Sequence, residues 1–234
     1  MLRLDQLKLR QGDFSLQADL ALPAGAVTAV MGPSGGGKST LLLAIAGFLT
    51  PQSGRVIWDG VDLTGKPPGE RPVSVLFQDN NLFPHLTVLQ NLALGRRPSG
   101  RLSADETGQA MDLLAKVGLK GLEGRKPGSL SGGQQSRAAL ARVLLADRPL
   151  VLLDEPFAAL GPGLRDEMLD LVVQMLAGPG RSVLLVTHGP DDARRSAASV
   201  IAVIGGEAHP PVDTTQFLTN PPPGMQDYLG RPGR

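Results

Sequence analysis

The stretch Gly32-Pro33-Ser34-Gly35-Gly36-Gly37-Lys38-Ser39-Thr40 decides the fold, because it fits the pattern G-x-x-x-x-G-K-[ST]. An apolar run over residues 26–31 precedes it and predicts a buried strand, and residues 39–48 after it predict a helix. The glycines let successive backbone N–H groups point at phosphate oxygens, and the helix start attracts the same anion. The alternative is a flexible turn in a chain with 30 glycines, and it leaves the flanking strand and helix unexplained.

Within this stretch, two side chains have chemistry suited to a nucleoside triphosphate. Lys38 is expected to reach the β- and γ-phosphates, and the hydroxyl of Ser39 is expected to bind Mg²⁺. The sequence therefore predicts ATP and Mg²⁺ as the cofactors.

Two carboxylates follow a second apolar run. Residues 150–153 predict a strand that ends at Asp154-Glu155. Ligands of open α/β sheets bind at the carboxyl ends of the strands, so Asp154 is expected to join the magnesium site. Glu155 is expected to orient or deprotonate the attacking water, as a catalytic residue. The alternative is a polar strand end that meets solvent.

Gln78 and His188 each end another predicted strand. Gln78 follows residues 73–77 and is expected to bind the metal or the water through its amide, whereas His188 follows residues 182–186 and is expected to donate to the γ-phosphate as a third catalytic group beside Glu155 and Lys38. Taken singly, a Gln or a His at a strand end is more often a polar residue that simply meets solvent. Their position at the same sheet edge as the two motifs favours the functional interpretation.

Working outward, strands alternate with helices, which predicts an α/β fold with a mostly parallel sheet. Residues 14–22 alternate as a half-buried strand, with an antiparallel partner marked by Leu2, Leu4, Leu7 and Leu9. We expect an ATP-binding core over residues 1–78 and 148–206, including an antiparallel β subdomain. Residues 79–147 are expected to form an inserted helical subdomain, with helices over 104–117 and 132–146. The proline-rich tail, 207–234, is expected to be loosely packed surface.

Composition narrows the possible partners and the compartment. Lys and Arg total 23 against 22 Asp and Glu, so no basic field favours nucleic acid as a partner. The absence of cysteine excludes disulfides, zinc sites and thiol nucleophiles. No signal peptide and no membrane-spanning run is visible, so a cytoplasmic chain is expected, tied to a membrane only through a partner.

The pentapeptide Leu130-Ser131-Gly132-Gly133-Gln134 resembles the signature of ABC-type ATPases, and the order of all five motifs is the family order. The resemblance covers residues 1 to about 205. It implies a P-loop ATPase that works as a head-to-tail dimer. In such a dimer Ser131, Gly133 and Gln134 meet the γ-phosphate of the ATP held by the other copy, and closure of the dimer is the power stroke.

Within that family, residues 47–51, 67–68 and 71–83 look like bacterial importer ATPases, and the last stretch is most similar to thiamine importer subunits. The resemblance implies a translocase at the cytoplasmic face of the inner membrane. It implies a transmembrane permease as direct partner and a substrate-binding protein as an indirect one. Phe83, Pro84, His85 and Leu86 are candidates for the groove that grips the permease. The alternative role of these four residues is core packing of the helical subdomain.

Three positions depart from the family pattern or leave it open. The family usually has S-A-L-D after the catalytic glutamate, whereas residues 158–161 here read Ala-Ala-Leu-Gly, so Gly161 puts communication between the two sites in doubt. Gln135-Ser136-Arg137 replaces the commoner Arg-Gln-Arg. Phe14 is a candidate for stacking on adenine, although its place on the apolar face of a strand favours the core.

Two alternative functions stay open from the sequence. One is a non-transport ABC ATPase in nucleic-acid repair or translation, although no coiled coil, zinc site or tandem cassette supports it. The other is a regulatory module that binds nucleotide and hydrolyses it poorly, as suggested by Gly161.

Overall fold

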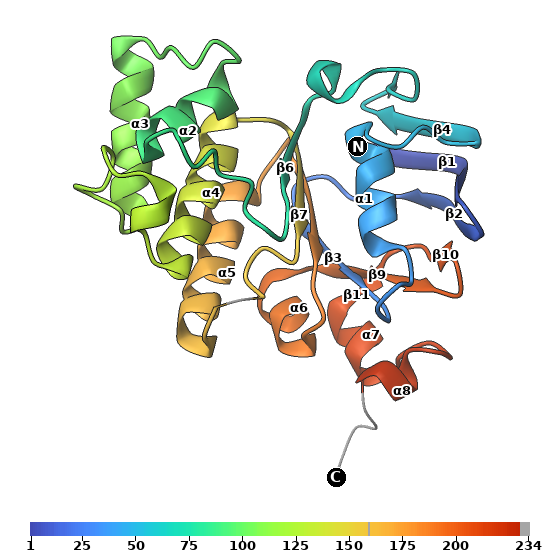
Figure 1. Ribbon diagram of the computed structural model, residues 1–234. Helices are drawn as coiled ribbons and strands as arrows, with labels where there is room; N and C mark the ends of the chain where they lie inside the picture. The colour runs from blue at the N-terminus through green and yellow to red at the C-terminus, as the bar shows by residue number, and fades with distance from the viewer. Residues whose placement is uncertain (159, 230–234) are drawn as a thin grey trace.

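Parallel strands form the centre of the computed structural model, which describes residues 1–158 and 160–229 (Figure 1). The expected mostly parallel sheet is confirmed. Because helices cover both faces, almost every side chain of these strands is buried apolar surface. Their order across the sheet is β6 (Val73–Leu76), β7 (Leu150–Asp154), β8 (Ser182–Val186), β3 (Val27–Met31) and β9 (Ser199–Ile204).

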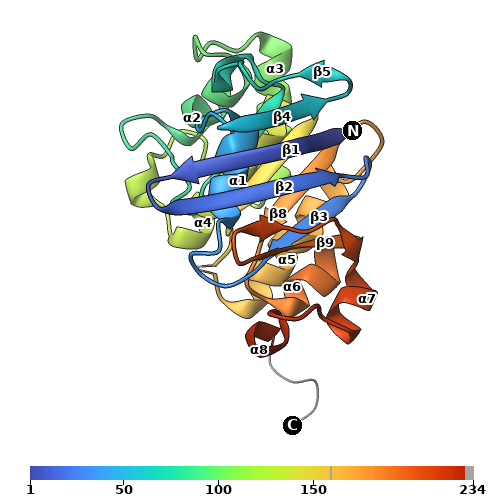
Figure 2. The same ribbon diagram turned by 90° about the vertical axis from the view of Figure 1, so that its right-hand side faces the viewer.

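The expected antiparallel strands are also present, and they continue the same sheet. They are β1 (Leu2–Gln11), β2 (Phe14–Ala21), β4 (Ser53–Trp58) and β5 (Val61–Asp62). The short strand β10 (Glu207–Ala208) pairs with both β2 and β9 and joins the two halves, and β11 (Val212–Asp213) adds to β9. Figure 2 shows β1, β2 and β4 crossing in front of the parallel strands.

A bulge in β1 explains the spacing of its leucines. The register with both neighbouring strands shifts between Leu4 and Leu7, and Gln6 has a φ of 45°. One extra residue turns the side chains after it to the other face. Leu2, Leu4, Leu7 and Leu9 are therefore all buried on one side, although their numbering breaks strict alternation.

Helix α1 (Lys38–Ala46) lies between the antiparallel and the parallel strands, where its buried residues share one core with β1, β2 and β7 (Figure 2). Its C-terminal end is fixed by the buried guanidinium of Arg71, which donates to the carbonyls of Ala44 and Ile45 at 2.8 Å each. The Ala44 carbonyl also accepts from the N–H of Gly47 at 3.2 Å, so Arg71 adds to the backbone cap at this end of the helix. The C-terminal end of the helix that begins at the phosphate loop is therefore fixed.

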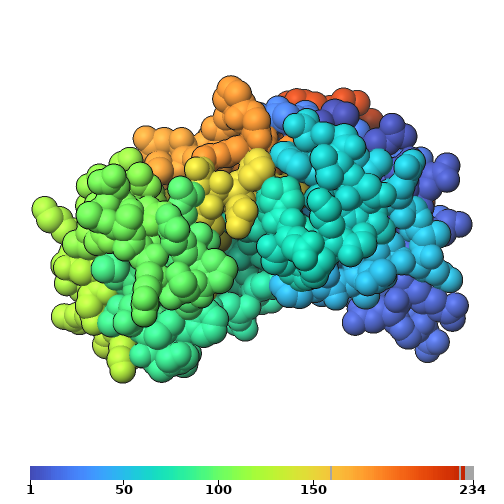
Figure 3. All heavy atoms as spheres, turned by 90° about the horizontal axis from the view of Figure 1, so that it is seen from above, coloured from blue at the N-terminus to red at the C-terminus, as the bar shows by residue number. Residues whose placement is uncertain are grey.

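The opposite face of the parallel strands is covered by α4 (Gly132–Ala146) and α5 (Pro162–Leu176). Residues 79–147, the range expected to form an inserted helical subdomain, contain α2 (Val88–Arg96), α3 (Ala104–Lys116) and α4, with a 3₁₀ turn at Pro127–Ser129 between α3 and α4; another 3₁₀ turn, at Pro68–Glu70, precedes β6. Figure 3 shows this subdomain as one lobe and the N-terminal strands as another, with the core between them. Within the described residues, no helix has the length and apolar character needed to cross a membrane.

The C-terminal tail is packed, which corrects the expectation of a loose surface segment. It contains β10, β11, α7 (Thr214–Thr219) and α8 (Gln226–Leu229), and it lies beside α6 (Pro190–Ser196). Phe217 is 2 % exposed and Met225 is fully buried against β3 and β9. Phe217 and Met225 therefore anchor the segment, although its many prolines leave no regular spacing of apolar residues from which this packing could be predicted. Residues 230–234 of the predicted tail lie outside the described residues.

Candidate functional site

The phosphate loop runs from the end of β3 to the start of α1 in a shape that requires glycine. A Cβ atom at Gly32 would lie 2.1 Å from the carbonyl oxygen of Val203, and one at Gly37 would lie 2.6 Å from the ring of Phe14. Gly37 also has a φ of 103°, which a side chain would strain. The loop therefore lies directly against β9 and Phe14.

The start of α1 has no side-chain cap, because Gly37 occupies the capping position. The first N–H groups of the helix are consequently free to bind a ligand. Lys38 lies over the same loop, and its Nζ donates to the carbonyls of Gly32 and Pro33 at 2.8 and 3.0 Å. Burial lowers the pKa of Lys38, while the carboxylates of Glu155 and Asp154 act in the opposite direction. Helix start and ammonium together form an anion site.

An open hollow of about 340 Å³ lies over the loop and brings half of the predicted site residues together. Phe14 is half-buried in its wall, so it contacts both the core and the hollow. The sequence left these two roles as alternatives, and the structure gives Phe14 both contacts. The hollow is lined by Gln11, Phe14, Ser34, Gly35, Gly37, Lys38, Ser39, Thr40, Glu155 and His188.

Asp154 and Glu155 stand at the end of β7, where Glu155 lines this hollow and Asp154 lies next to Ser39, which also lines it. Burial raises the pKa of Asp154, and a hydrogen bond from Ser39 and the charge of Lys38 partly offset that effect. Glu155 has a φ of 46°, an uncommon conformation for a residue with a side chain. This backbone turn lets two consecutive carboxylates serve the same site.

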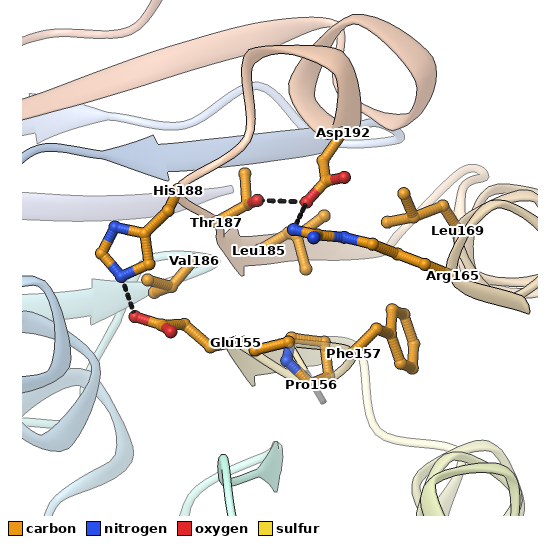
Figure 4. Close-up of a pocket in the computed structure, with 11 residues that line it drawn as sticks. Glu155, Pro156, Phe157, Arg165, Leu169, Leu185, Val186, Thr187, His188 and Asp192 are labelled. Atoms are coloured by element: carbon orange, nitrogen blue, oxygen red, sulfur yellow. Dashed lines mark hydrogen bonds and ion pairs between the residues drawn. The ribbon is translucent and has the colours of Figure 1, made fainter. Parts of the chain in front are cut away.

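His188, just beyond the end of β8, contacts Glu155 through its Nε2, which faces Oε1 of the glutamate (Figure 4). The neighbouring Thr187 hydroxyl donates to Asp192, which also pairs with Arg165 of α5. These contacts line a small pocket behind the two residues and fix the turn between β8 and α6. Glu155, predicted to activate the water, and His188, predicted to bind the γ-phosphate, thus contact each other directly.

Gln78 lies two residues beyond β6, where it is exposed and does not line the hollow. The segment after it is tied to the helical subdomain. Arg142 of α4 donates to the carbonyls of Asn81 and Asn80 at 2.6 and 2.9 Å, and both asparagines have positive φ. Movement of the segment that carries Gln78 is therefore linked to α4.

The signature forms the start of α4, on the face of the parallel sheet opposite α1 (Figure 1). Ser131 and Gln134 close a reciprocal capping box, and Ser131 is exposed. A Cβ at Gly133 would approach the tip of Leu164 to 2.6 Å. Neither Ser131 nor Gly133 lines the hollow, so the structure does not bring the signature to the phosphate loop of its own chain.

Two regions singled out by the sequence lie near this site. Gly161 is the N-cap of α5 and supplies no side-chain hydrogen bond, while Ala159 lies outside the described residues. Phe83, Pro84 and His85 are exposed, which contradicts the alternative that they pack the core of the subdomain. Buried Asn91 holds their loop through bonds to both the N–H and the carbonyl of Phe83.

The sequence did not identify three contributors to the site. Tyr228 of α8 contacts the ring of His188, Arg142 holds the segment after Gln78, and Arg71 holds α1. No local pattern marks them, since each acts across a long sequence separation.

Sequence comparison places the chain among known proteins. The family model for ABC transporters matches residues 16–158. The thiamine import ATP-binding protein ThiQ of Cereibacter sphaeroides is 58 % identical over 98 % of this chain and 100 % of its own length. The protein of the same name from a Ruegeria species is 55 % identical over the same shares.

Solved structures agree with the sequence comparison. A nucleotide-free ATP-binding cassette from an ABC transporter superposes with a TM-score of 0.85 at 26 % identity, covering 99 % of both chains. A dimeric cassette in a post-hydrolysis state, bound to ADP and Pi, superposes with a TM-score of 0.80 at 30 % identity, covering 92 % of this chain and 99 % of the other.

Proposed function

The chain belongs to the ABC transporter family, and from that premise we propose that it is the ATP-hydrolysing subunit of a bacterial thiamine importer. Two relatives above 50 % identity carry that function in their names. The observation that carries the catalytic part is the hollow in which the phosphate loop, Glu155 and His188 face one another. The importer part rests on the relatives and on the exposed loop around Phe83.

ATP is held, in this proposal, by residues 32–40. The N–H groups of the loop and of the α1 start bind the phosphate oxygens, and Lys38 adds a charge to the β- and γ-phosphates. Phe14 lies beside the loop and supplies an aromatic surface for the adenine. The rest of the base and the sugar would face solvent, because the hollow is open.

Mg²⁺ is supported by the donor set next to Lys38. Asp154 is a half-buried carboxylate next to the hydroxyl of Ser39, and carboxylate and hydroxyl oxygens are both ligands that Mg²⁺ prefers. No group of three or more acidic or histidine side chains in the described residues forms an all-protein cage. A site with one carboxylate, one hydroxyl and phosphate oxygens is typical of magnesium nucleotides. We propose Ser39, Asp154 and, after closure, Gln78 as its residues. The bound ion would neutralise charge on the β- and γ-phosphates.

Hydrolysis requires that Glu155 and His188 separate. In this structure the Nε2 atom of His188 contacts the carboxylate of Glu155. When the γ-phosphate enters, His188 is free to donate Nε2–H to it, and Glu155 is free to orient and deprotonate the attacking water. The pairing keeps both groups from acting before ATP arrives.

The signature acts on a second copy of the chain. Ser131, Gly133 and Gln134 face away from their own phosphate loop, and a head-to-tail dimer supplies the opposing site. A related cassette has been solved as a dimer bound to ADP and Pi. Closure of the dimer over ATP is then the motion that drives transport.

The permease is proposed to bind the exposed loop that contains Phe83, Pro84, His85 and Leu86. Asn91 fixes the shape of that loop, and Arg142 links the neighbouring asparagines to α4. Permease motion and closure over ATP would share this connection. The chain would sit peripherally at the cytoplasmic face of the inner membrane, with a substrate-binding protein on the other side.

The catalytic assignment is tested by Glu155→Gln, with Glu70→Gln as a control at an exposed carboxylate. We expect turnover to fall roughly 10²–10⁴-fold and ATP-bound dimers to accumulate in size-exclusion chromatography. Unchanged turnover would refute the role given to Glu155. The control variant should hydrolyse ATP at the normal rate.

The substrate is tested separately, in proteoliposomes that contain the permease co-purified with this chain. Thiamine with its binding protein should raise the ATPase rate and drive uptake of labelled thiamine. Stimulation by a different solute, with none by thiamine, would leave the ATPase intact and reject the importer assignment.

A further inference from the structure

The ring of His188 is held at both nitrogens, by partners from opposite parts of the fold. Its Nε2 contacts Glu155, at the end of β7. Its Nδ1 lies 2.8 Å from the hydroxyl of Tyr228, which belongs to α8 and is 40 residues further along the chain. Tyr228 is the one tyrosine in the sequence. The final helix therefore reaches into the site where hydrolysis is proposed.

Hydrogen-bond chemistry fixes where the protons lie. An ionised carboxylate only accepts, so Nε2 opposite Glu155 must carry a proton. In neutral imidazole Nδ1 is then an acceptor, and the Tyr228 hydroxyl is the donor to it. The other acceptor near that hydroxyl, the carbonyl of His188, is at 3.4 Å and competes poorly.

The C-terminal segment is anchored well enough to place this hydroxyl. Met225 is fully buried, and Tyr228 and Leu229 pack against the same cluster of β3, β9 and α7 side chains. The N–H of Leu229 donates to the carbonyl of Met225 at 2.9 Å. Gly224, with a φ of 88°, lies so close to Ile204 that a Cβ there would come within 2.9 Å. The turn into α8 is therefore pressed against β9.

We propose that Tyr228 is a positioning residue for His188, which keeps the imidazole in the tautomer that carries its proton on Nε2. The proposal rests on the role in hydrolysis given to His188 above. With Nδ1 engaged, the ring presents Nε2–H to Glu155 before ATP arrives and to the γ-phosphate afterwards, without moving a proton. The C-terminal segment thereby becomes part of the hydrolytic site.

A purely structural role would give Tyr228 a different signature. In that case the hydroxyl would only help to dock α8, and its removal would loosen the tail and leave the tautomer unchanged. Tyr228→Phe removes the hydroxyl and keeps the ring that packs on the tail cluster. Gln226→Ala is the matched control, because it changes an exposed residue of the same helix.

The tautomer is measured directly by ¹⁵N–¹H NMR of the full chain with labelled histidine. The sequence has three histidines, and His188→Ala assigns the relevant signals. We expect His188 to be in the Nε2–H form in the wild type and in Gln226→Ala. In Tyr228→Phe we expect a mixture with the Nδ1–H form. Hydrogen exchange of residues 212–229 should be the same in all three.

Steady-state kinetics supply the second readout. Losing one neutral hydrogen bond should lower kcat for ATP hydrolysis by about fivefold in Tyr228→Phe, with KM within about twofold of the wild type. A wild-type Nδ1–H tautomer, an unchanged tautomer in Tyr228→Phe, an unchanged kcat, or a rate loss accompanied by faster exchange of the tail would each overturn the proposal. If His188→Ala hydrolyses ATP normally, the assigned role of His188 fails instead, whatever the NMR result.

Discussion

The starts of α1 and α4 are both predicted to meet ATP, yet they are built in opposite ways. At α1 the capping residue is Gly37, in a left-handed conformation with no side-chain bond. At α4 the Ser131 hydroxyl accepts from the N–H of Gln134, and the Gln134 amide oxygen accepts from the N–H of Ser131 at 2.9 Å. At α1 no side chain accepts from the first N–H groups, whereas at α4 the Ser131 hydroxyl satisfies the N–H of Gln134 and leaves those of Gly132 and Gly133 without a side-chain acceptor.

The difference indicates an order of events. Unpaired N–H groups at α1 are stabilised by phosphate, so the loop is a binding site in a single chain. The start of α4 has its own side-chain cap and still leaves the N–H groups of Gly132 and Gly133 without one, and its position opposite α1 leaves these groups to a second copy. ATP should therefore bind the monomer first, and the signature should contribute at the dimer step.

The largest expected effect is the loss of ATP binding in Lys38→Ala. Its ammonium is buried over the loop, and losing a buried charge contact to phosphate should weaken ATP binding roughly 10²–10³-fold. Isothermal titration with the monomer measures this value. Lys120→Ala, at an exposed lysine, is the control. If Lys38→Ala binds ATP with normal affinity, the phosphate loop at the start of α1 does not supply the binding energy. The proposed difference between the starts of α1 and α4 would then be wrong.

Ser131→Ala tests the other side of the comparison, with Ser103→Ala as a matched control. Ser103 closes an equivalent capping box at α3, so both variants should lose about 1 kcal/mol of stability. Only Ser131→Ala should weaken ATP-dependent dimerisation, by roughly tenfold. Sedimentation with ATP and titration of the monomer measure the two steps. Weaker ATP binding to the Ser131→Ala monomer would contradict the proposed order.

The sequence predicted the parts of this comparison that depend on local pattern. The phosphate loop, the strand that ends at Asp154 and the helix that begins at Gly132 follow from glycine spacing and apolar runs, and the structure has all three. Each of these three features is encoded in one short stretch of sequence. The mostly parallel sheet followed from the alternation of strands and helices along the chain.

Features that depend on long-range packing were missed. Phe217 and Met225 anchor the tail across β3 and β9, and nothing in the local sequence indicates their partners. The contact of Tyr228 with His188 joins two ends of the fold that have no shared motif. The exposure of Gln78 likewise depends on how the segment after β6 leaves the sheet. Local sequence pattern therefore indicated the candidate site, but it did not indicate the residues that reach this site from distant parts of the chain.

A third helix start, at α5, allows a smaller test. Gly161 caps α5 without a side-chain bond, and a Cβ there would meet no atom within 4 Å. Gly161→Asp should therefore fit, and it should stabilise the chain by a few tenths of a kcal/mol by capping the helix. If the usual family aspartate couples the two sites, the Hill coefficient for ATP hydrolysis should rise. A Hill coefficient unchanged in a more stable variant would limit the effect to capping, and Gly163→Ala, inside the same helix, is the control.

The smallest effect concerns the pH dependence of the capping boxes. At α3 the reciprocal partner is Glu106, and hydrogen bonds from Arg97 and Ser103 lower its pKa from 4.5 to about 2, whereas Gln134 at α4 does not titrate. Because the folded pKa lies below the unfolded one, the stabilisation is present above pH 4.5 and is lost as the pH falls towards 2. Urea unfolding should show Glu106→Gln less stable than the wild type at pH 7, with the gap narrowing by pH 3. Gln134→Glu should gain a pH dependence of the same sign. If the difference in unfolding free energy between the wild type and Glu106→Gln does not change with pH, the charge of Glu106 does not contribute to the cap of α3. The cap would then act as the uncharged Gln134 does at α4.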